Sequence, residues 1–136
     1  MLKIAGIDHI VLRTTKLSET LHFYSEILGC KIERETSPEI GLTQLRAGAA
    51  LIDLVTVDSQ LGEMGGGPPS SGENNLDHFC LQLTPTTEES ITEHLNNHQI
   101  KTGKFSPRYG AEGMGNSIYI KDPEGNTVEL RIKQYG

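Results

Sequence analysis

Hydrophobic and polar positions divide the chain into two similar successions of expected strands and helices. In the first, residues 6–14 form a short, β-branched apolar run, which predicts a strand. Residues 16–30 carry apolar side chains at helical spacing, with Ser18 as the expected N-cap and Gly29 at the helix end. Further strands are predicted at residues 31–36, 40–48 and 49–57.

A Gly-, Pro- and Ser-rich stretch separates this half from a second half of the same kind. Residues 59–74 include consecutive glycines followed by two prolines, which cannot continue a strand or a helix and therefore predict a linker. A strand is then predicted at residues 75–83, followed by a helix that Thr87 caps. The remaining strands are predicted at residues 101–105 and in a hairpin over 116–133 that turns at 122–126.

The two halves are related by a fixed offset at their first strands. His9 lies 69 residues before His78 (78 − 9), and both follow an aspartate. Because internal repeats determine the architecture, we predict an α+β fold with two paired βαβββ modules in one domain. The domain is expected to cover residues 1–136, with modules at about 6–58 and 75–133.

Four polar side chains recur at matched places in the two modules. Side chains alternate between the two faces of a strand, so His9 and His78 hold equivalent positions on the first strand of their modules. Asp53 and Glu129 lie in the last strand of each module. A carboxylate in a strand as apolar as that around Asp53 needs a compensating partner. If the modules pack as a pseudo-symmetric pair, two imidazoles and two carboxylates meet in one cleft. That set of ligands suits Zn, Ni, Co, Mn or Fe(II).

Each of these residues also has a structural interpretation. A histidine can be a hydrogen-bonded core residue, Glu129 can form an ion pair with an arginine, and Asp53 can be a hydrogen-bonded structural residue. Asp8 and Asp77 are expected to face away from the histidines beside them and to bond loop amides. Cys80 is expected to be a small buried residue rather than a reactive thiol.

Composition narrows the range of partners. The chain carries 18 acidic and 12 basic residues, a formal net charge of −6, and no block of Lys and Arg. This disfavours nucleic acid and anionic membrane surfaces, so a small molecule is the expected partner. The N-terminal apolar stretch is interrupted too early for a signal peptide or a membrane span. Cys30 and Cys80 do not make a disulfide framework, and a reducing cytoplasm is the expected location.

Four phrases of the sequence resemble the vicinal oxygen chelate superfamily, which includes glyoxalase I, extradiol dioxygenases, and fosfomycin- and bleomycin-resistance proteins. They are DHIVLRTTKLSETLHFYSEILG, LIDLV, LDHFCLQL and SIYIKDPEGNTVEL. The resemblance implies that the two modules form a curved mixed sheet around a metal cleft. It also implies metal ligands at His9, His78 and Glu129, with Asp53 at a fourth position where glyoxalase I has Glu or Gln.

Several other side chains are candidates for substrate binding. By the resemblance, Arg13 occupies the place of an arginine that in glyoxalase I contacts a carboxylate of glutathione. Gln44 and Tyr119 are expected to line the cleft, and the Gly-rich stretch 106–116 is expected to be a flap from which Arg108 reaches in. The alternatives for these residues are ordinary strand packing and an ordinary surface loop.

The resemblance implies a metal-dependent, glyoxalase I-like lyase or isomerase that acts on two neighbouring substrate oxygens, with a glutathione or other thiol adduct as a candidate substrate. Glu129 or Asp53 would then shuttle a proton. The alternatives are a ring-cleaving dioxygenase, a thiol transferase that confers resistance, and a metal-free drug-binding protein. Because two modules can also pair across chains, a homodimer is expected.

Overall fold

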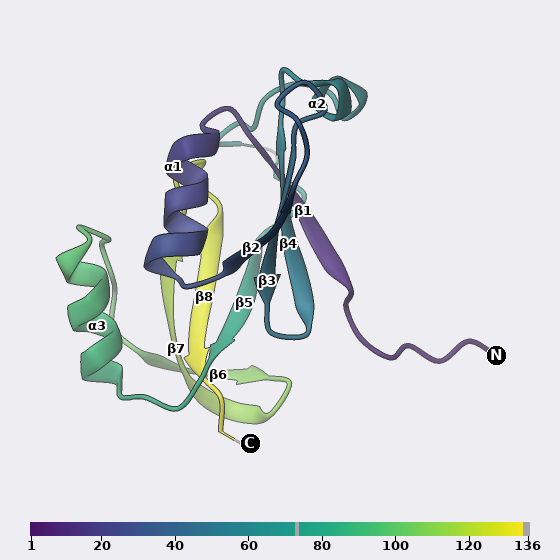
Figure 1. Ribbon diagram of the computed structural model, residues 1–136. Helices are drawn as coiled ribbons and strands as arrows, with labels where there is room; N and C mark the ends of the chain where they lie inside the picture. The colour runs from purple at the N-terminus through teal and green to yellow at the C-terminus, as the bar shows by residue number, and fades with distance from the viewer. Residues whose placement is uncertain (73, 135–136) are drawn as a thin grey trace. The chain divides into compact units, whose positions relative to one another are not determined.

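A computed structural model describes residues 1–72 and 74–134, so residue 73 of the predicted linker lies outside the described residues. The chain divides into two compact units, Met1–Ser70 and Ser71–Gly136. Each unit contains one βαβββ module with its own four-stranded mixed sheet (Figure 1). The predicted α+β class with two such modules is confirmed.

The first module pairs its first strand with its last. Its elements are β1 (His9–Thr14), α1 (Leu17–Leu21), the π-helical segment η1 (His22–Ile27), β2 (Lys31–Glu35), β3 (Leu42–Ala47) and β4 (Ala50–Thr56). The strand order is β1-β4-β3-β2, in which β1 and β4 are parallel and the other neighbours antiparallel. A short helix, α2 (Gln60–Met64), follows β4.

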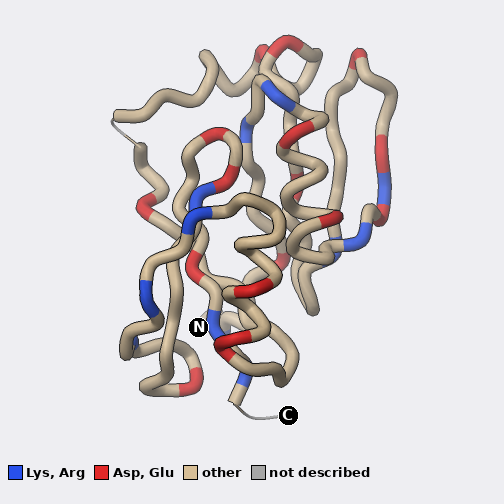
Figure 2. The backbone as a smooth tube through the Cα atoms, turned by 90° about the vertical axis from the view of Figure 1, so that its left-hand side faces the viewer, with Lys and Arg blue, Asp and Glu red and all other residues tan. Residues whose placement is uncertain are grey.

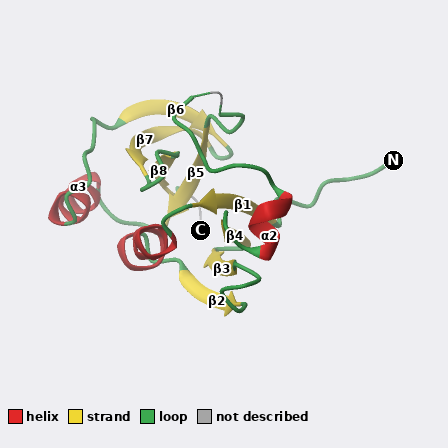
Figure 3. Cartoon of the chain, turned by 90° about the horizontal axis from the view of Figure 1, so that it is seen from above, coloured by secondary structure: helices red, strands yellow, loops and turns green. Residues whose placement is uncertain are grey.

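The second module repeats this topology. Its elements are β5 (His78–Leu83), α3 (Glu88–Asn97), β6 (Ser106–Gly110), β7 (Gly113–Lys121) and β8 (Thr127–Ile132). The strand order is β5-β8-β7-β6, again with the first and last strands parallel. Figure 3 shows α3 alongside this sheet rather than within it. Each module therefore places its first and last strands side by side, so the strand that begins with the histidine lies next to the strand that carries the carboxylate.

Side chains alternate between the two faces of β4 and of β8. In β4, Ile52 and Leu54 are fully buried and flank Asp53, which points to the opposite face. In β8, Val128 and Leu130 flank Glu129 in the same way. Helical side chains are also buried, namely Phe23, Tyr24 and Ile27 in the first module and Ile91 and Leu95 in the second. The opposite face of β8 carries Thr127 and Arg131 beside Glu129, whereas that of β4 carries Leu51 and Val55 beside Asp53.

Helix boundaries partly follow the sequence expectations. Thr87 caps α3 as predicted, because its hydroxyl accepts a hydrogen bond from the Ser90 amide at 3.1 Å. Gly29 has a φ of 85° just after the first helical segment, as expected of a helix end. The prediction that Ser18 is an N-cap is wrong. The helix begins at Leu17, one residue earlier, and has no side-chain cap.

Two element assignments are also wrong. No strand forms at residues 101–105, and the second strand of this module is β6, which lies in the stretch predicted to be a loop. The tight turn between β6 and β7 depends on Gly113, whose φ is 89°. The predicted linker contains α2, whose first turn is capped by the Ser59 hydroxyl accepting from the Gly62 amide at 3.0 Å.

Charged residues of both signs are interspersed along the backbone (Figure 2), as the sequence indicates. Among the described helices, none is long and apolar enough to cross a membrane.

Candidate functional site

The histidine that opens each module bonds the aspartate just before it. Asp8 Oδ1 lies 2.6 Å from His9 Nδ1, and Asp77 Oδ2 lies 2.6 Å from His78 Nδ1. The prediction that these aspartates bond loop amides is therefore wrong. Both aspartates stand at the start of a strand and are highly exposed, so their side chains are free to turn along the chain toward the neighbouring imidazole.

This contact defines the chemistry of each ring. A carboxylate bonded to Nδ1 holds the proton on that nitrogen, which leaves Nε2 as the nitrogen that can bind a metal ion. It also raises the pKa of His9 and of His78 above the ordinary value of 6.5. For both histidines, the hydrogen bond to the preceding aspartate is the largest cause.

Asp53 in β4 is the carboxylate of the first module. It is only 3% exposed and lies on the same face as Val11, its register partner in the parallel strand β1. Its Oδ2 accepts from Gln44 Nε2 at 3.2 Å, whereas its buried Oδ1 has no hydrogen-bond partner among the described residues. The negative charge of Asp53 also contributes to the raised pKa of His9. A buried oxygen without a donor is a candidate position for a ligand or a proton.

Gln44 continues from Asp53 to an arginine. Gln44 is opposite Asp53 in the antiparallel register of β3 and β4, and its Oε1 accepts from Arg34 Nη1 at 2.8 Å. Arg34, in β2, is exposed. The first module thus contains a relay of side chains from a surface guanidinium through an amide to a buried carboxylate.

Glu129 in β8 is the carboxylate of the second module, and it reaches the histidine directly. Its Oε1 lies 3.1 Å from His78 Nε2. His78 therefore stands between two carboxylates, with Asp77 on one ring nitrogen and Glu129 on the other. A proton shared in this way also raises the pKa of His78, and a metal ion at the same place would replace that proton.

The surroundings of Glu129 stabilise its charged form. Burial by itself raises the pKa of Glu129, but Ser117, Tyr119, His78 and Cys80 all act in the opposite direction, so the pKa lies below its ordinary value. Glu129 is therefore ionised at neutral pH, as a metal ligand must be.

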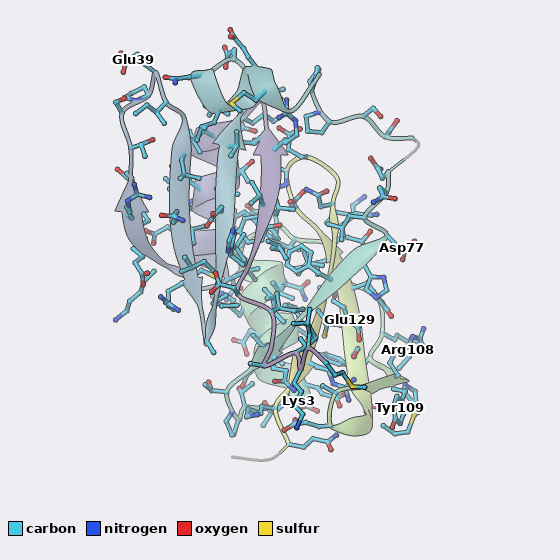
Figure 4. The ribbon with its side chains drawn as sticks, turned by 90° about the vertical axis from the view of Figure 1, so that its right-hand side faces the viewer. Lys3, Glu39, Asp77, Arg108, Tyr109 and Glu129 are labelled. Atoms are coloured by element: carbon cyan, nitrogen blue, oxygen red, sulfur yellow. The ribbon has the colours of Figure 1, made fainter. Side chains whose placement is uncertain are left out.

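Tyr119 and Arg108 complete the polar group around Glu129. The Tyr119 ring meets the His78 ring edge to face, with centroids 5.5 Å apart, and Tyr119 is the register partner of Glu129. Arg108 Nε donates to the Tyr119 hydroxyl at 3.2 Å, and its guanidinium lies 5.7 Å from the ring centroid. Figure 4 labels Glu129 on β8 together with Arg108 and its exposed neighbour Tyr109 on β6.

Arg13 lies on β1, where it is engaged by the backbone beyond α2. Its Nη2 donates to the carbonyl oxygens of Gly66 at 2.5 Å and Gly67 at 3.1 Å, and its Nε contacts Gly67 at 3.3 Å. A side chain on Gly65 would collide with the Arg13 guanidinium. The glycines of the predicted linker thus accept hydrogen bonds from Arg13 through their carbonyl oxygens. The sequence pattern alone does not reveal this contact.

Two features near Glu129 were not expected from the sequence. Arg131, two residues along β8, is 3% exposed and donates through Nη2 to the Gly113 carbonyl at 3.1 Å. Cys80 is exposed rather than buried, so that expectation is wrong. Its thiol pKa is nevertheless raised to about 12, first by desolvation and then by Glu129, which keeps it protonated and unreactive.

The donor chemistry of the two modules suits a divalent ion. Each module offers an imidazole whose Nδ1 is occupied by a carboxylate, and each offers a buried carboxylate on the neighbouring strand. Among residues 1–72 and 74–134, no three His, Cys, Asp or Glu side chains lie together as a ready-made metal site.

Comparison with known proteins places the sequence pattern in a family. Residues 6–130 match the model of the glyoxalase/bleomycin resistance protein/dioxygenase superfamily. The virulence protein STM3117 of Salmonella typhimurium is 32% identical over 133 residues, which cover 97% of this chain and 85% of that protein. Biphenyl-2,3-diol 1,2-dioxygenase 3 of Rhodococcus globerulus is 28% identical over 130 residues, covering 93% of this chain but only 63% of the dioxygenase.

Solved structures show the same fold. The crystal structure of STM3117 matches with a TM-score of 0.73 and 26% identity, covering 98% of this chain and 100% of that chain. Lactoylglutathione lyase from Agrobacterium tumefaciens matches with a TM-score of 0.68 and 20% identity, covering 96% and 95%. The fosfomycin resistance protein FosX from Listeria monocytogenes matches with a TM-score of 0.70 and 20% identity, covering 97% and 96%.

Proposed function

Because the chain belongs to the glyoxalase/bleomycin resistance protein/dioxygenase superfamily, we propose that it is a divalent-metal-dependent enzyme acting on a small substrate through two neighbouring oxygens. The observation that carries this proposal is the 3.1 Å separation of His78 Nε2 and Glu129 Oε1, with His78 Nδ1 held by Asp77. The proposed ligands are His9, His78 and Glu129, with Asp53 as a fourth. This set suits Ni, Co, Zn, Mn or Fe(II).

The leading reaction is an isomerisation of the glyoxalase I kind. When bound, the ion would act as a Lewis acid on the two substrate oxygens. The chain supplies the proton transfer: one carboxylate takes a proton from the carbon beside the carbonyl and returns it to the neighbouring carbon. One C–H bond breaks and another forms, and the hydroxyl proton passes from one of the two neighbouring oxygens to the other, so no external oxidant is needed.

Asp53 is the better candidate for that base, and Glu129 for a permanent ligand. Asp53 Oδ1 is buried and bonded to no described residue, so it is available to receive a proton. Glu129 is held by several neighbours, and its lowered pKa makes it a weaker base. Gln44 and Arg34 would hold Asp53 in place from the other side.

Substrate binding would fall to residues around these carboxylates. Arg108 and Tyr119 stand beside Glu129, and Gln44 stands beside Asp53. Arg13 donates to neutral carbonyls, and an anion such as a carboxylate of a glutathione adduct would form a stronger, charge-assisted bond with it. Arg13 would then exchange its contacts with Gly66 and Gly67 for the substrate.

The assembly that forms the site is part of the proposal. The two modules of one chain, or modules from two chains, could bring His9 to His78, and a homodimer in the cytoplasm is the arrangement we favour. Light scattering at two protein concentrations tests the dimer, since a constant monomer mass would contradict it.

A ring-cleaving dioxygenase is the second candidate. It requires only His9, His78 and Glu129 around Fe(II) or Mn. Asp53, which bonds Gln44 rather than His9, could then stay outside the metal ligands. The similarity to the Rhodococcus dioxygenase supports this candidate. A thiol transferase that confers resistance is a further alternative, and the chain shares its fold with the fosfomycin resistance protein FosX. A metal-free drug-binding protein would have no use for the buried carboxylates.

Metal analysis followed by turnover separates these functions. Protein stripped with a chelator would be titrated calorimetrically with Ni²⁺, Co²⁺, Zn²⁺, Mn²⁺ and Fe²⁺, with His94→Ala on α3 as a control for surface histidines. The loaded protein would then be offered the methylglyoxal–glutathione hemithioacetal, a catechol panel, and fosfomycin with a thiol. Absence of metal binding would contradict every enzyme assignment. Metal binding without hemithioacetal turnover would reject the glyoxalase reaction alone.

A further inference from the structure

The second module contains a hollow of 610 Å³ at the end of β7. Its walls come from residues 99–101 after α3, residues 119–121 of β7, and Thr127 at the start of β8. It forms because β6 pairs with β7 only from Gly113 to Ser117, so the rest of β7 has no strand beyond it on that side. We call this hollow the Lys101–Lys121 pocket.

The pocket adjoins the proposed chelating residues of the same module. Tyr119 is one of its lining residues, and the Tyr119 ring stands against the His78 ring with centroids 5.5 Å apart. His78, Thr127 and Lys121 are register partners in one row across three strands. Neighbouring strands are about 4.8 Å apart, so the backbones of His78 and Lys121 are separated by roughly 10 Å. A small molecule held at His78 and Glu129 can therefore extend into the pocket.

The charge of the pocket is positive. Lys101 and Lys121 are its charged lining residues, and no carboxylate lines it. The Lys121 ammonium donates to the Thr127 hydroxyl, and the Lys101 ammonium has no partner among the described residues. Two ammonium-bearing residues that line one concave surface attract an anion more strongly than isolated lysines do.

We propose that the Lys101–Lys121 pocket binds an anionic group of the substrate, a carboxylate or a phosphate, while two neighbouring oxygens at the other end of that substrate are held at His78 and Glu129. Anion binding is inferred from the pocket alone, whereas the binding of two oxygens at His78 and Glu129 rests on the proposed function. The substrate would therefore be a small anion that carries two neighbouring oxygens at one end and its negatively charged group at the other.

The first test leaves out the metal. Metal-free, ¹⁵N-labelled protein would be titrated with inorganic phosphate and with acetate, and backbone amide shifts followed by NMR. Both probes are expected to shift residues 99–101 and 119–121. The double variant Lys101→Met/Lys121→Met should lose these shifts, and Lys104→Met, which removes one positive charge outside the pocket, should keep them. Shifts that persist in the double variant would overturn the inference.

The second test uses the Co²⁺-loaded protein and matched pairs of probes. Dihydroxyacetone is compared with its phosphate, and catechol with 3,4-dihydroxybenzoate, by changes in the visible spectrum of Co²⁺. Because a charge-assisted contact accounts for about 1.5–3 kcal/mol, the anionic member of a pair should bind at least about tenfold more tightly. The double variant should lose that advantage while it still binds dihydroxyacetone or catechol as before. Whichever pair shows the preference identifies phosphate or carboxylate.

The two tests separate a failure of the inference from a failure of the proposed function. If Co²⁺ binds and the anionic probes show no preference over the neutral ones, the pocket does not hold the substrate anion, although the metal centre stands. If no divalent ion binds, the proposed function fails. The phosphate and acetate titrations then decide whether the pocket binds anions by itself.

Discussion

The two modules repeat one arrangement of histidine and differ in the carboxylate that accompanies it. In both, the preceding aspartate lies 2.6 Å from Nδ1. In the second module Glu129 also reaches His78 Nε2 at 3.1 Å, whereas in the first the shorter Asp53 bonds Gln44 and influences His9 only through its charge. A difference of one methylene thus separates an assembled pair of metal donors from an incomplete one.

The difference has a simple physical origin. The orientation of each histidine depends on the residue next to it in the sequence, so both modules reproduce it. The direction of each carboxylate depends on its length and on the residue opposite it in the sheet, which is Gln44 in one module and Tyr119 in the other. The comparison leads us to expect that the second module dominates metal affinity and that Asp53 is available for proton transfer.

Removing one carboxylate at a time should give the largest contrast between the modules. Glu129→Gln is expected to weaken binding of Co²⁺ or Zn²⁺ by at least about a hundredfold, the upper end of the effect known for outer partners of metal ligands. Asp53→Asn should weaken it by about tenfold or less. Calorimetric titration measures both, with the exposed Glu93→Gln on α3 as a control. Equal losses would mean that the two carboxylates are equivalent ligands.

Exchanging the lengths of the carboxylates tests the role of the methylene. Glu129→Asp should withdraw the carboxylate from His78 and weaken metal binding by roughly ten- to a hundredfold. Asp53→Glu should leave affinity unchanged or raise it, because the longer side chain can approach His9. Since Asp53 is 3% exposed, the thermal midpoint of each variant must be measured to exclude overpacking. A loss of affinity in a stably folded Asp53→Glu variant would refute the length argument.

The aspartates that precede the histidines should have equal roles in the two modules, with a smaller effect. Asp8→Asn and Asp77→Asn remove the main cause of the raised pKa, so each histidine should titrate closer to 6.5 in the metal-free protein. His78 should retain part of its shift because Glu129 still contacts it. NMR titration of the imidazole resonances measures these values, and unchanged values in both variants would contradict the assigned contacts.

The same substitutions have a defined effect on pH dependence. A protonated imidazole cannot bind a metal ion, so affinity falls as the pH falls through the raised pKa of His78. In Asp77→Asn that fall should begin at a lower pH. At pH values above that fall, the affinity of Asp77→Asn for the metal ion should be about tenfold weaker than that of the unmodified protein, because the ring has lost its orienting partner. A profile that moves to higher pH would contradict the direction of the pKa shift.

Local patterns predicted much of the fold. The cap at Thr87 and the repeated histidine strands depend on nearby residues and were predictable. The strand β6 was not predictable, because it contains a Pro and a Gly within five residues and its pairing with β7 is what makes it a strand. Pro107 is tolerated there because β6 is an edge strand. Similarly, α2 forms within a Gly-rich stretch because Ser59 caps it.

Prediction of the site had a comparable limit. The repeat in the sequence predicted His78 in the first strand of the second module and Glu129 in its last strand, and the contact between them follows from the parallel pairing of β5 and β8. The role of Asp8 and Asp77 was missed because it depends on side-chain rotation at the end of a strand. The Gln44 link between Arg34 and Asp53 required the register of three strands, which no local pattern determines.

The smallest difference expected between the modules is in stability, and it concerns an arginine that contacts a glycine in each module. A methyl group on Gly65 would meet Arg13, and one on Gly115 would meet Arg131. Arg13 is half-buried and can move aside, whereas Arg131 is 3% exposed and bonded to the Gly113 carbonyl. Gly115→Ala should therefore lower the free energy of unfolding by about 1–2 kcal/mol, in the range of overpacking, and Gly65→Ala by less than about 0.5 kcal/mol.

Urea denaturation followed by circular dichroism measures both variants, with Gly103→Ala, where a methyl group meets nothing, as the control. Because each module has its own sheet, the transition must first be shown to be two-state before free energies are compared. If Gly65→Ala is as destabilising as Gly115→Ala, Arg13 is as firmly held as Arg131. The proposed exchange of Arg13 from the Gly66 and Gly67 carbonyls to a substrate anion would then be energetically unfavourable.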